Sequence, residues 1–271
     1  MEIGVSTRLF MNQRLSSHIL DSIHKAGIGQ LEIFAARQHL DYCDANHVRD
    51  VAQWFSDHAM NLHSVHAPLF QGIDSGHSGG LAISPSYVEK RLRIESMDEI
   101  KRAIEIADRL PFRYLVVHLG RPDDEYDLRK FDAAFTSLEH LGIFARQRGV
   151  QILVENGTSP LDAPIRVLEF IQYTRLEVKV CFDAGHAHLS GGVLPALEML
   201  KPHVAALHLH DNRKDADDHL LPFEGSIDWP ETVPELRKIE RAAALVEVND
   251  RAAGTQEIAR VQSAVRKLHE L

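Results

Sequence analysis

The 271-residue sequence lacks the features that mark membrane-spanning and secreted proteins. No apolar stretch approaches the roughly 20 residues needed to cross a bilayer, so we expect no association with a membrane. The N-terminal stretch MEIGVSTRLF has no basic region followed by an apolar segment, and we expect no signal peptide. Only two cysteines occur, Cys43 and Cys181, at a spacing that matches no metal or redox motif. We expect both to be buried free thiols, which fits a reducing, cytoplasmic setting.

An excess of positive charge is also missing, since the formal net charge is −9 at pH 7. Phosphate contacts dominate the affinity for nucleic acids, so this balance disfavours a general polyanion-binding protein. It does not exclude nucleic acid as a partner, because a bound metal cluster can supply positive charge locally. The composition leaves the oligomeric state open, and a homo-oligomer is possible.

No linker rich in proline or serine divides the chain, and we expect one domain over residues 1–271. Eight short apolar runs have the pattern of strands buried on both faces: Glu2–Ser6, Gln30–Phe34, Leu62–His66, Tyr114–His118, Gln151–Glu155, Val178–Asp183, Val204–His208 and Ala244–Val248. Helical patterns fill most of the gaps: Leu15–Ala26, His47–His58, Tyr87–Leu110, Leu128–Arg148, Pro164–Tyr173, Leu194–Leu200, Trp229–Ile239 and Ile258–Leu271. Eight strands alternating with eight helices predict an α/β fold, the (β/α)8 TIM barrel.

Six of these apolar runs end in a residue type that binds metals: His66, His118, Glu155, Asp183, His208 and Glu247. The C-terminal ends of barrel strands meet at one mouth, where barrel enzymes place their chemistry. We therefore expect these six side chains to converge.

Strands five to eight supply a set of ligands on their own: Glu155, Asp183, His208 and Glu247. Carboxylates and an imidazole that converge from several backbone segments suit a divalent ion such as Mn²⁺, Co²⁺, Mg²⁺ or Zn²⁺. The sequence therefore predicts a divalent metal cofactor bound by these four residues.

Five further residues could enlarge the site. His66 and His118 close strands three and four, and His186 follows Asp183 in the spacing D-x-x-H. Asp217 and His219 form D-x-H in the long loop after strand seven. These residues either extend the site to two or three ions or hydrogen-bond a sugar-like substrate.

Two other loops follow predicted strands. Phe70–Pro85 contains four glycines, and it is either a lid that closes over the mouth or a surface loop. Arg121–Asp127 is a cluster of charged residues, RPDDEYD, which we expect to be a solvated loop.

Seven motifs occur in order along nearly the whole chain: HAPL at His66–Leu69, VVHLG at Val116–Gly120, VENG at Val154–Gly157, FDAGH at Phe182–His186, HLHDN at His208–Asn212, DDHLLPFEGSIDW at Asp217–Trp229 and VEVN at Val246–Asn249. This set resembles the xylose isomerase-like TIM barrel superfamily. That superfamily unites sugar isomerases and epimerases with zinc-dependent apurinic endonucleases.

The resemblance implies a metal-dependent isomerase or epimerase of a keto sugar or sugar phosphate. In that interpretation Glu155 and Glu247 transfer a proton next to a carbonyl while also touching the metal. The resemblance further implies that a small-molecule sugar substrate contacts His118, His186 and Arg251. Glu32, in the stretch GIGQLEIF, has the arrangement found in isomerase and epimerase members.

Two alternatives remain open. The endonuclease members bind three zinc ions through nine ligands, and all nine positions are matched here: His66, His118, Glu155, Asp183, His186, His208, Asp217, His219 and Glu247. However, Leu69 and Phe70 stand where those enzymes carry a tyrosine and an asparagine that grip DNA. A dehydratase or lyase acting on a keto sugar or cyclitol needs the same metal and bases as an isomerase.

Overall fold

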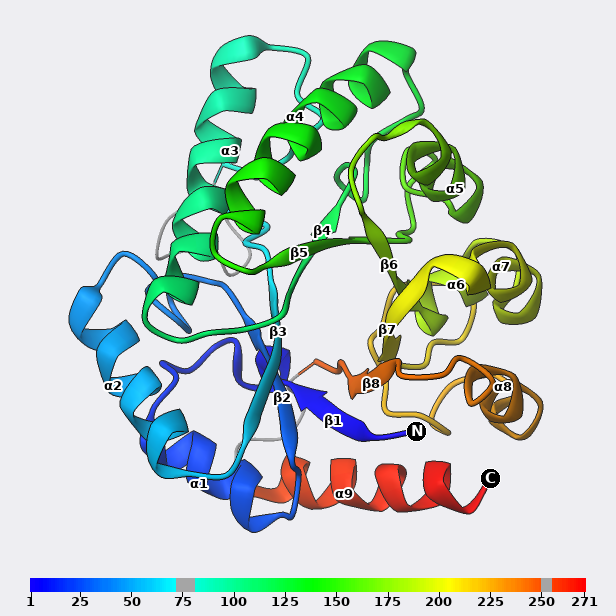
Figure 1. Cartoon of the computed structure of the whole chain (residues 1–271). Coiled ribbons are helices and arrows are strands. Elements are labelled where there is room, and N and C mark those ends of the chain that lie inside the picture. Colours follow the sequence, from blue (N-terminus) through cyan, green and yellow to red (C-terminus); the bar gives the residue numbers. More distant parts are fainter. Residues whose placement is uncertain (72–80, 250–254) are drawn as a thin grey trace.

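Eight parallel strands form a closed barrel in the computed structural model, which describes residues 1–71, 81–249 and 255–271 (Figure 1). The strands are β1 (Ile3–Ser6), β2 (Gln30–Phe34), β3 (Asn61–His66), β4 (Tyr114–His118), β5 (Gln151–Glu155), β6 (Lys179–Asp183), β7 (Val204–Leu209) and β8 (Ala243–Val246). Pairing of β1 with β8 closes the ring, with Ile3 opposite Ala244. The predicted (β/α)8 TIM barrel is confirmed, and every predicted strand overlaps the observed one.

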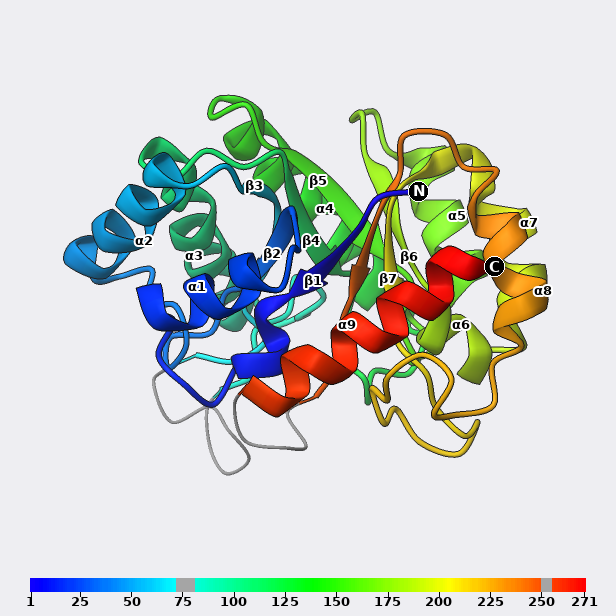
Figure 2. The ribbon, with the colours of Figure 1, turned by 90° about the horizontal axis from the view of Figure 1, so that it is seen from below.

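Helices cover the outside of this barrel, as Figures 1 and 2 show. They are α1 (Ser17–Lys25), α2 (Ala45–Asp57), α3 (Lys90–Glu105), α4 (Leu128–Arg146), α5 (Pro164–Tyr173), α6 (Ala184–Leu189), α7 (Val193–Leu200), α8 (Trp229–Leu236) and α9 (Thr255–Glu270). The sequence pattern does not predict the short α6. Asp183 starts it directly at the end of β6, because its carboxylate accepts a hydrogen bond from the backbone N–H of His186. None of the helices in these ranges is long and apolar enough to cross a membrane.

Side chains along each strand alternate between the barrel interior and the surrounding helices. The outward residues Val154 and Phe182 belong to the large core that the strands share with the helices. A separate small apolar cluster consists of Tyr114, Val116, Leu153, Cys181 and Ala206. Two residues beyond three of its members, and therefore on the same inner face, stand Glu155, Asp183 and His208. The apolar cluster thus forms the layer beneath the polar mouth.

The long loop after β7 carries two predicted ligands, Asp217 and His219, and a single buried carboxylate fixes its course. Asp211 accepts hydrogen bonds of 2.9–3.1 Å from the backbone N–H groups of Asn212, Phe223 and Ile227 and from the indole N–H of Trp229. Its own backbone also pairs with Leu220. The carboxylate of Asp211 therefore ties the start of the loop to its end.

The two cysteines differ in their surroundings. Cys181 is buried inside the barrel, as expected. Cys43 is exposed, so the expectation of a buried thiol is wrong there. Cys43 belongs to a short turn that precedes α2, where the chain runs over the surface.

We predict that Asp211→Ala lowers the free energy of unfolding by about 3 kcal/mol or more, because four donors lose their acceptor at about 1 kcal/mol each. Urea denaturation followed by circular dichroism measures the change. The matched control is Asp228→Ala, which removes only the N-cap of α8 and should cost about 1 kcal/mol. Equal losses in the two variants would show that Asp211 does not organise the loop.

Candidate metal centre

The mouth of the barrel brings all nine predicted ligands together. Three groups of side chains have their ligand atoms within 4.8 Å of one another: Glu155, Asp183, His208 and Glu247; His66, His118 and Glu155; and His186, His210, Asp217 and His219. Glu155 belongs to the first two groups, so these share one carboxylate. His210 is the one member that was not predicted from the sequence.

The first group, which contains Glu155, Asp183, His208 and Glu247, surrounds one ring nitrogen. Nδ1 of His208 lies 2.9 Å from Oε1 of Glu155 and 2.8 Å from Oε2 of Glu247. The distance from the same nitrogen to Oδ2 of Asp183 is 3.9 Å. Ligand atoms bound at about 2.1 Å to a tetrahedral ion lie about 3.4 Å apart, so these spacings are compatible with one shared ion.

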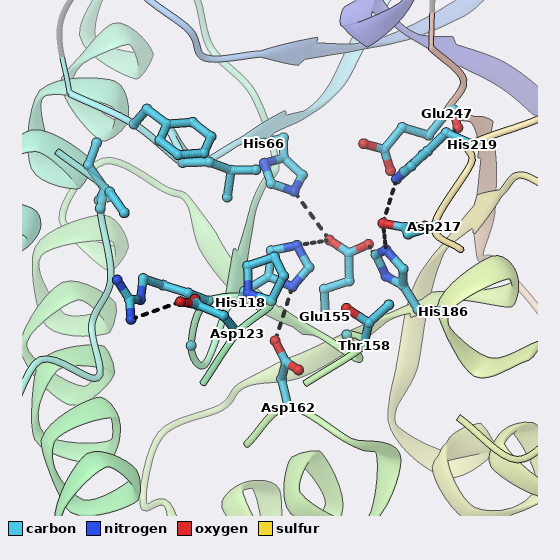
Figure 3. A pocket seen from close by; sticks show the side chains of 18 of the residues that line it. His66, His118, Asp123, Glu155, Thr158, Asp162, His186, Asp217, His219 and Glu247 are labelled. Atoms are coloured by element: carbon cyan, nitrogen blue, oxygen red, sulfur yellow. Dashed lines mark hydrogen bonds and ion pairs between the residues drawn. The ribbon is translucent and has the colours of Figure 1, made fainter. Parts of the chain in front are cut away.

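The second and third groups are each centred on a carboxylate, as Figure 3 shows. Nε2 atoms of His66 and His118 lie 3.3 and 3.4 Å from Oε2 of Glu155. Nε2 atoms of His186 and His219 both lie 3.3 Å from Oδ2 of Asp217. Asp217 and His219 come from the loop that Asp211 fixes, which brings this part of the sequence to the mouth.

Most of these imidazoles have one nitrogen engaged away from the mouth. Backbone carbonyls face the Nδ1 atoms of three rings: Ala67 O faces His66, Asn156 O faces His186 and Glu247 O faces His219. A carbonyl can only accept a hydrogen bond, so each Nδ1 carries a proton, and in the neutral form of each ring Nε2 keeps a lone pair. Such backing is typical of histidines that bind a metal.

Buried carboxylate oxygens of the first group are left without donors. Among the described residues, Oε2 of Glu155, Oδ2 of Asp183 and Oε2 of Glu247 have no aligned hydrogen-bond partner. Burying charged oxygens without compensation is costly, and a cation placed among them removes that cost. The donor set of carboxylates and imidazoles suits Zn²⁺ or Mn²⁺. The residues present therefore fit a divalent ion.

Electrostatic interactions within the mouth lower the pKa values of its carboxyl groups and raise those of two of its imidazoles. Burial alone would raise the pKa of Glu155, but the imidazoles of His208 and His118 outweigh it and hold this pKa well below the usual carboxyl range. Burial likewise disfavours the charged forms of His186 and His208, yet the surrounding acidic groups raise both pKa values well above 6.5. Burial together with the Arg8 guanidinium lowers the pKa of His219 to about 4. In the metal-free mouth, protons on His186 and His208 therefore offset the carboxylate charge.

We predict that binding of Zn²⁺ to metal-free protein releases protons, and that the apparent affinity keeps rising with pH above 6.5, the ordinary imidazole pKa. The sign follows from the raised pKa values, because His186 and His208 must lose a proton before they can bind the ion. Titration calorimetry at neutral pH in two buffers of different ionisation enthalpy counts the protons released. Zinc binding without proton release would contradict these protonation states.

Glu32 on β2 supports the first group from below, a role that the sequence did not reveal. It is fully buried, and its Oε2 accepts from the Ser64 hydroxyl at 2.7 Å and lies 3.1 Å from Nε2 of His208. Once His208 has lost the proton from Nδ1 and keeps the one on Nε2, the ring can present the lone pair of Nδ1 to an ion shared with Glu155 and Glu247. Glu32 therefore orients His208 without itself facing the mouth.

We predict that Glu32→Gln weakens divalent-metal binding about 10- to 100-fold, since such supporting carboxylates fix the orientation of a ligand and make it more basic. Competition with a chromophoric chelator measures the affinity. Glu99→Gln is the matched control, because Glu99 is also buried but bonds Tyr42 and Arg102 away from the mouth. An unchanged metal affinity in Glu32→Gln would show that Glu32 does not orient His208 for metal binding.

A cavity of about 530 Å³ opens at this mouth, and its lining includes Arg8, His118, His186 and Glu247. Arg8 follows β1, and its guanidinium lies 3.5 Å from Glu247 and donates to Asn249. It places a cation beside Glu247 that the sequence did not lead us to expect. Arg251, predicted to contact substrate, lies outside the described residues.

Two loops border the cavity. The loop Phe70–Pro85, for which a lid and a surface loop were both left open, falls largely on residues 72–80, which are outside the described ranges. Its flanks form a bridge between Phe70 and Ala82. The expectation that Arg121–Asp127 is a solvated loop is wrong in part. Asp124 is buried and accepts from Ser86 and Lys130, and Arg121 lines the cavity. The hydrogen bonds to the buried carboxylate of Asp124 hold this segment against the barrel.

Comparison with known proteins places the chain in a family. The family model "Xylose isomerase-like TIM barrel" matches residues 20–268. The uncharacterized protein y4fM of Sinorhizobium fredii is 31% identical over 191 residues, which are 63% of this chain and 60% of that protein. A solved D-tagatose 3-epimerase-like protein is 22% identical with a TM-score of 0.79, covering 100% of this chain and 99% of the other. The IolI protein, solved with a bound zinc atom, is 16% identical with a TM-score of 0.77, covering 99% and 98%. The chain belongs to the xylose isomerase-like TIM barrel family.

Proposed function

We propose that this protein is a divalent-metal-dependent isomerase or epimerase acting on a keto sugar or sugar phosphate. One observation carries the proposal. Glu155 ends β5 and Glu247 follows β8, and both carboxylates line the cavity and lie within 3 Å of the same nitrogen of His208. Two carboxylates around a single metal position are the arrangement needed to move a proton between neighbouring carbons.

The metal would be held by Glu155, Asp183, His208 and Glu247, and when bound it would supply positive charge next to the carbonyl and hydroxyl oxygens of the substrate. The pKa values of Glu155 and Glu247 are both held well below the usual range, chiefly by His208 against the effect of burial, so both side chains are ionised at neutral pH. Either carboxylate can therefore accept the proton from the carbon next to the carbonyl.

The position to which a proton is returned distinguishes isomerisation from epimerisation. Return of the proton to the neighbouring carbon isomerises the sugar, whereas delivery of a proton from the opposite face inverts the same carbon. Glu155 and Glu247 approach the metal position from β5 and the end of β8, which suits transfer on either face. His118 and His186 line the cavity and could bind substrate hydroxyls, and Arg8 could contact a polar or anionic group.

The size of the cavity and the net charge of the chain support a small substrate. About 530 Å³ accommodates a sugar or sugar phosphate rather than a duplex. The net charge of −9 opposes association with a polyanion. The likeness to a D-tagatose 3-epimerase-like protein is consistent with a ketose as substrate.

We predict that the metal-loaded protein exchanges hydrogen from solvent into the carbons next to the carbonyl of its ketose substrate. Proton NMR in D₂O with a panel of ketohexoses and their phosphates detects the loss of signal. Glu247→Gln should lower the exchange rate by about 10² or more, because one of the two proton-transfer groups is lost. Glu224→Gln, which removes a carboxylate outside the mouth, is the control.

The metal content of each variant is measured alongside. If Glu247→Gln kept its metal and its full rate, the acid–base role of Glu247 would be wrong. Product analysis also separates the alternatives, since a dehydratase or lyase acting on the same substrate would form a product that has lost water or a carbon fragment.

Hydrolysis of the phosphodiester at abasic DNA sites is the second candidate. One observation favours it, namely that the nine ligands resembling those of the endonucleases fall into three adjacent groups in space. Incubation of the zinc-loaded protein with a duplex that contains one abasic site tests it. Nicking at that site, together with no exchange on any ketose, would replace the isomerase proposal by the nuclease.

A further inference from the structure

The charged segment Arg121–Asp127 reaches the cavity, and the proposed proton transfer does not use it. Among the described residues that line the cavity, only Arg8 and Arg121 carry a guanidinium group. Arg8 lies beside the metal position, where Glu247 engages it. Arg121 lies elsewhere, because its ion-pair partner Asp123 stands across the cavity from Glu247 in Figure 3. The cavity therefore has a second cationic group, remote from the metal position.

A buried carboxylate fixes the backbone at Arg121. Oδ2 of Asp124 accepts a hydrogen bond from the backbone N–H of Arg121 at 2.9 Å, and the backbone N–H of Asp124 donates to the carbonyl of Arg121 at 3.0 Å. Lys130 donates to the other oxygen of Asp124 at 2.7 Å. The preceding Gly120 packs against Leu161 so closely that a Cβ would come within 2.6 Å of Cδ2. These contacts position Arg121 before any ligand binds.

The charge of Arg121 is only partly compensated by its neighbours. Nη2 lies 3.4 Å from Oδ2 of Asp123 and 3.5 Å from Oδ1 of Asp124, which are long distances for charge-assisted hydrogen bonds. Asp124 is already paired with Lys130 at 2.7 Å, and the side chain of Asp123 is 74% exposed, so solvent screens its charge. The guanidinium lies over the Tyr87 ring, with Cζ 5.5 Å from the centroid. Stacking of this kind leaves the edge nitrogens available for hydrogen bonds.

We infer that Arg121 binds an anionic group of the substrate, a phosphate ester or a carboxylate, at the end of the sugar remote from the carbonyl. The inference rests on the proposed function, in which the carbonyl end lies at the metal position. A planar guanidinium presents paired N–H donors that match the oxygens of phosphate and carboxylate. An anion bound there takes the place of the Asp123 carboxylate, which is exposed and can turn into solvent. The cavity of about 530 Å³ has room for a hexose that bears such a group.

Substrate discrimination tests the inference. The metal-loaded protein is given each ketohexose, its 6-phosphate and the ketohexuronate that carries a carboxylate at the same carbon, and kcat/KM for hydrogen exchange is measured by proton NMR in D₂O. We expect an anionic sugar to be preferred over the neutral one, and the preferred sugar identifies the group as phosphate or carboxylate. Arg121→Gln should lower this preference about 10- to 100-fold. The loss should fall mainly on KM, because the contact is made equally in the ground state and the transition state.

Three further variants sharpen the test. Arg129→Gln removes the same charge from an arginine that pairs with Asp127 outside the lining of the cavity, and it should keep the preference of the wild type. Asp123→Asn should raise the preference, because the carboxylate that competes for Arg121 is gone. Arg121→Lys should retain part of the preference, since lysine keeps the charge but lacks the paired donors.

Binding measured without turnover separates this inference from the proposed reaction. Fructose, fructose 6-phosphate and fructuronate are titrated into the metal-loaded wild type and into Arg121→Gln by calorimetry. If no ketose exchanges hydrogen, but an anionic sugar binds more tightly than fructose and Arg121→Gln removes the difference, the inference stands and the proposed reaction fails. Equal binding of the three sugars, or a preference that Arg121→Gln leaves unchanged, would overturn the inference even if ketoses do exchange hydrogen.

Discussion

Charge compensation among buried groups is the constraint on which this mouth depends. Glu155, Asp183 and Glu247 are buried, and each has an oxygen without an aligned donor among the described residues. Burying such charge is costly unless something neutralises it, and nearby imidazoles can do so by holding protons or by sharing a cation. The raised pKa values of His186 and His208, driven by the carboxylates against the effect of burial, express the same constraint. We expect such a site to release protons when it binds a metal ion.

The barrel makes this concentration of charge possible. Parallel strands deliver their C-terminal residues to one rim, and alternation along each strand places an apolar residue beneath a polar one, as Leu153 lies beneath Glu155. Supporting contacts then aim the ligands: Glu32 backs His208, and backbone carbonyls back His66, His186 and His219. Helices on the outside, seen in Figure 2, leave the mouth to the loops.

The sequence predicted the barrel and the convergence of six side chains, because an apolar run followed by a ligand residue is a local pattern that reports a strand end. It offered His186, Asp217 and His219 as candidate additions on the segments that follow. It did not predict His210, because this histidine lies beyond the predicted end of the strand at His208, where alternation along a strand no longer fixes the direction of a side chain. The roles of Glu32 and Arg8 were missed for a different reason: they depend on contacts with His208 on β7 and with Glu247 after β8, which are distant in sequence. The inward course of Arg121–Asp127 also depends on a tertiary contact, the bond from Ser86 to Asp124.

Anomalous diffraction from crystals of the zinc-loaded protein, measured on both sides of the zinc absorption edge, would locate each ion directly. We expect a peak about 2.0–2.2 Å from ligand atoms of Glu155, Asp183, His208 and Glu247. The absence of any peak at that position in protein saturated with zinc would contradict a metal-centred mouth and the chemistry proposed for it.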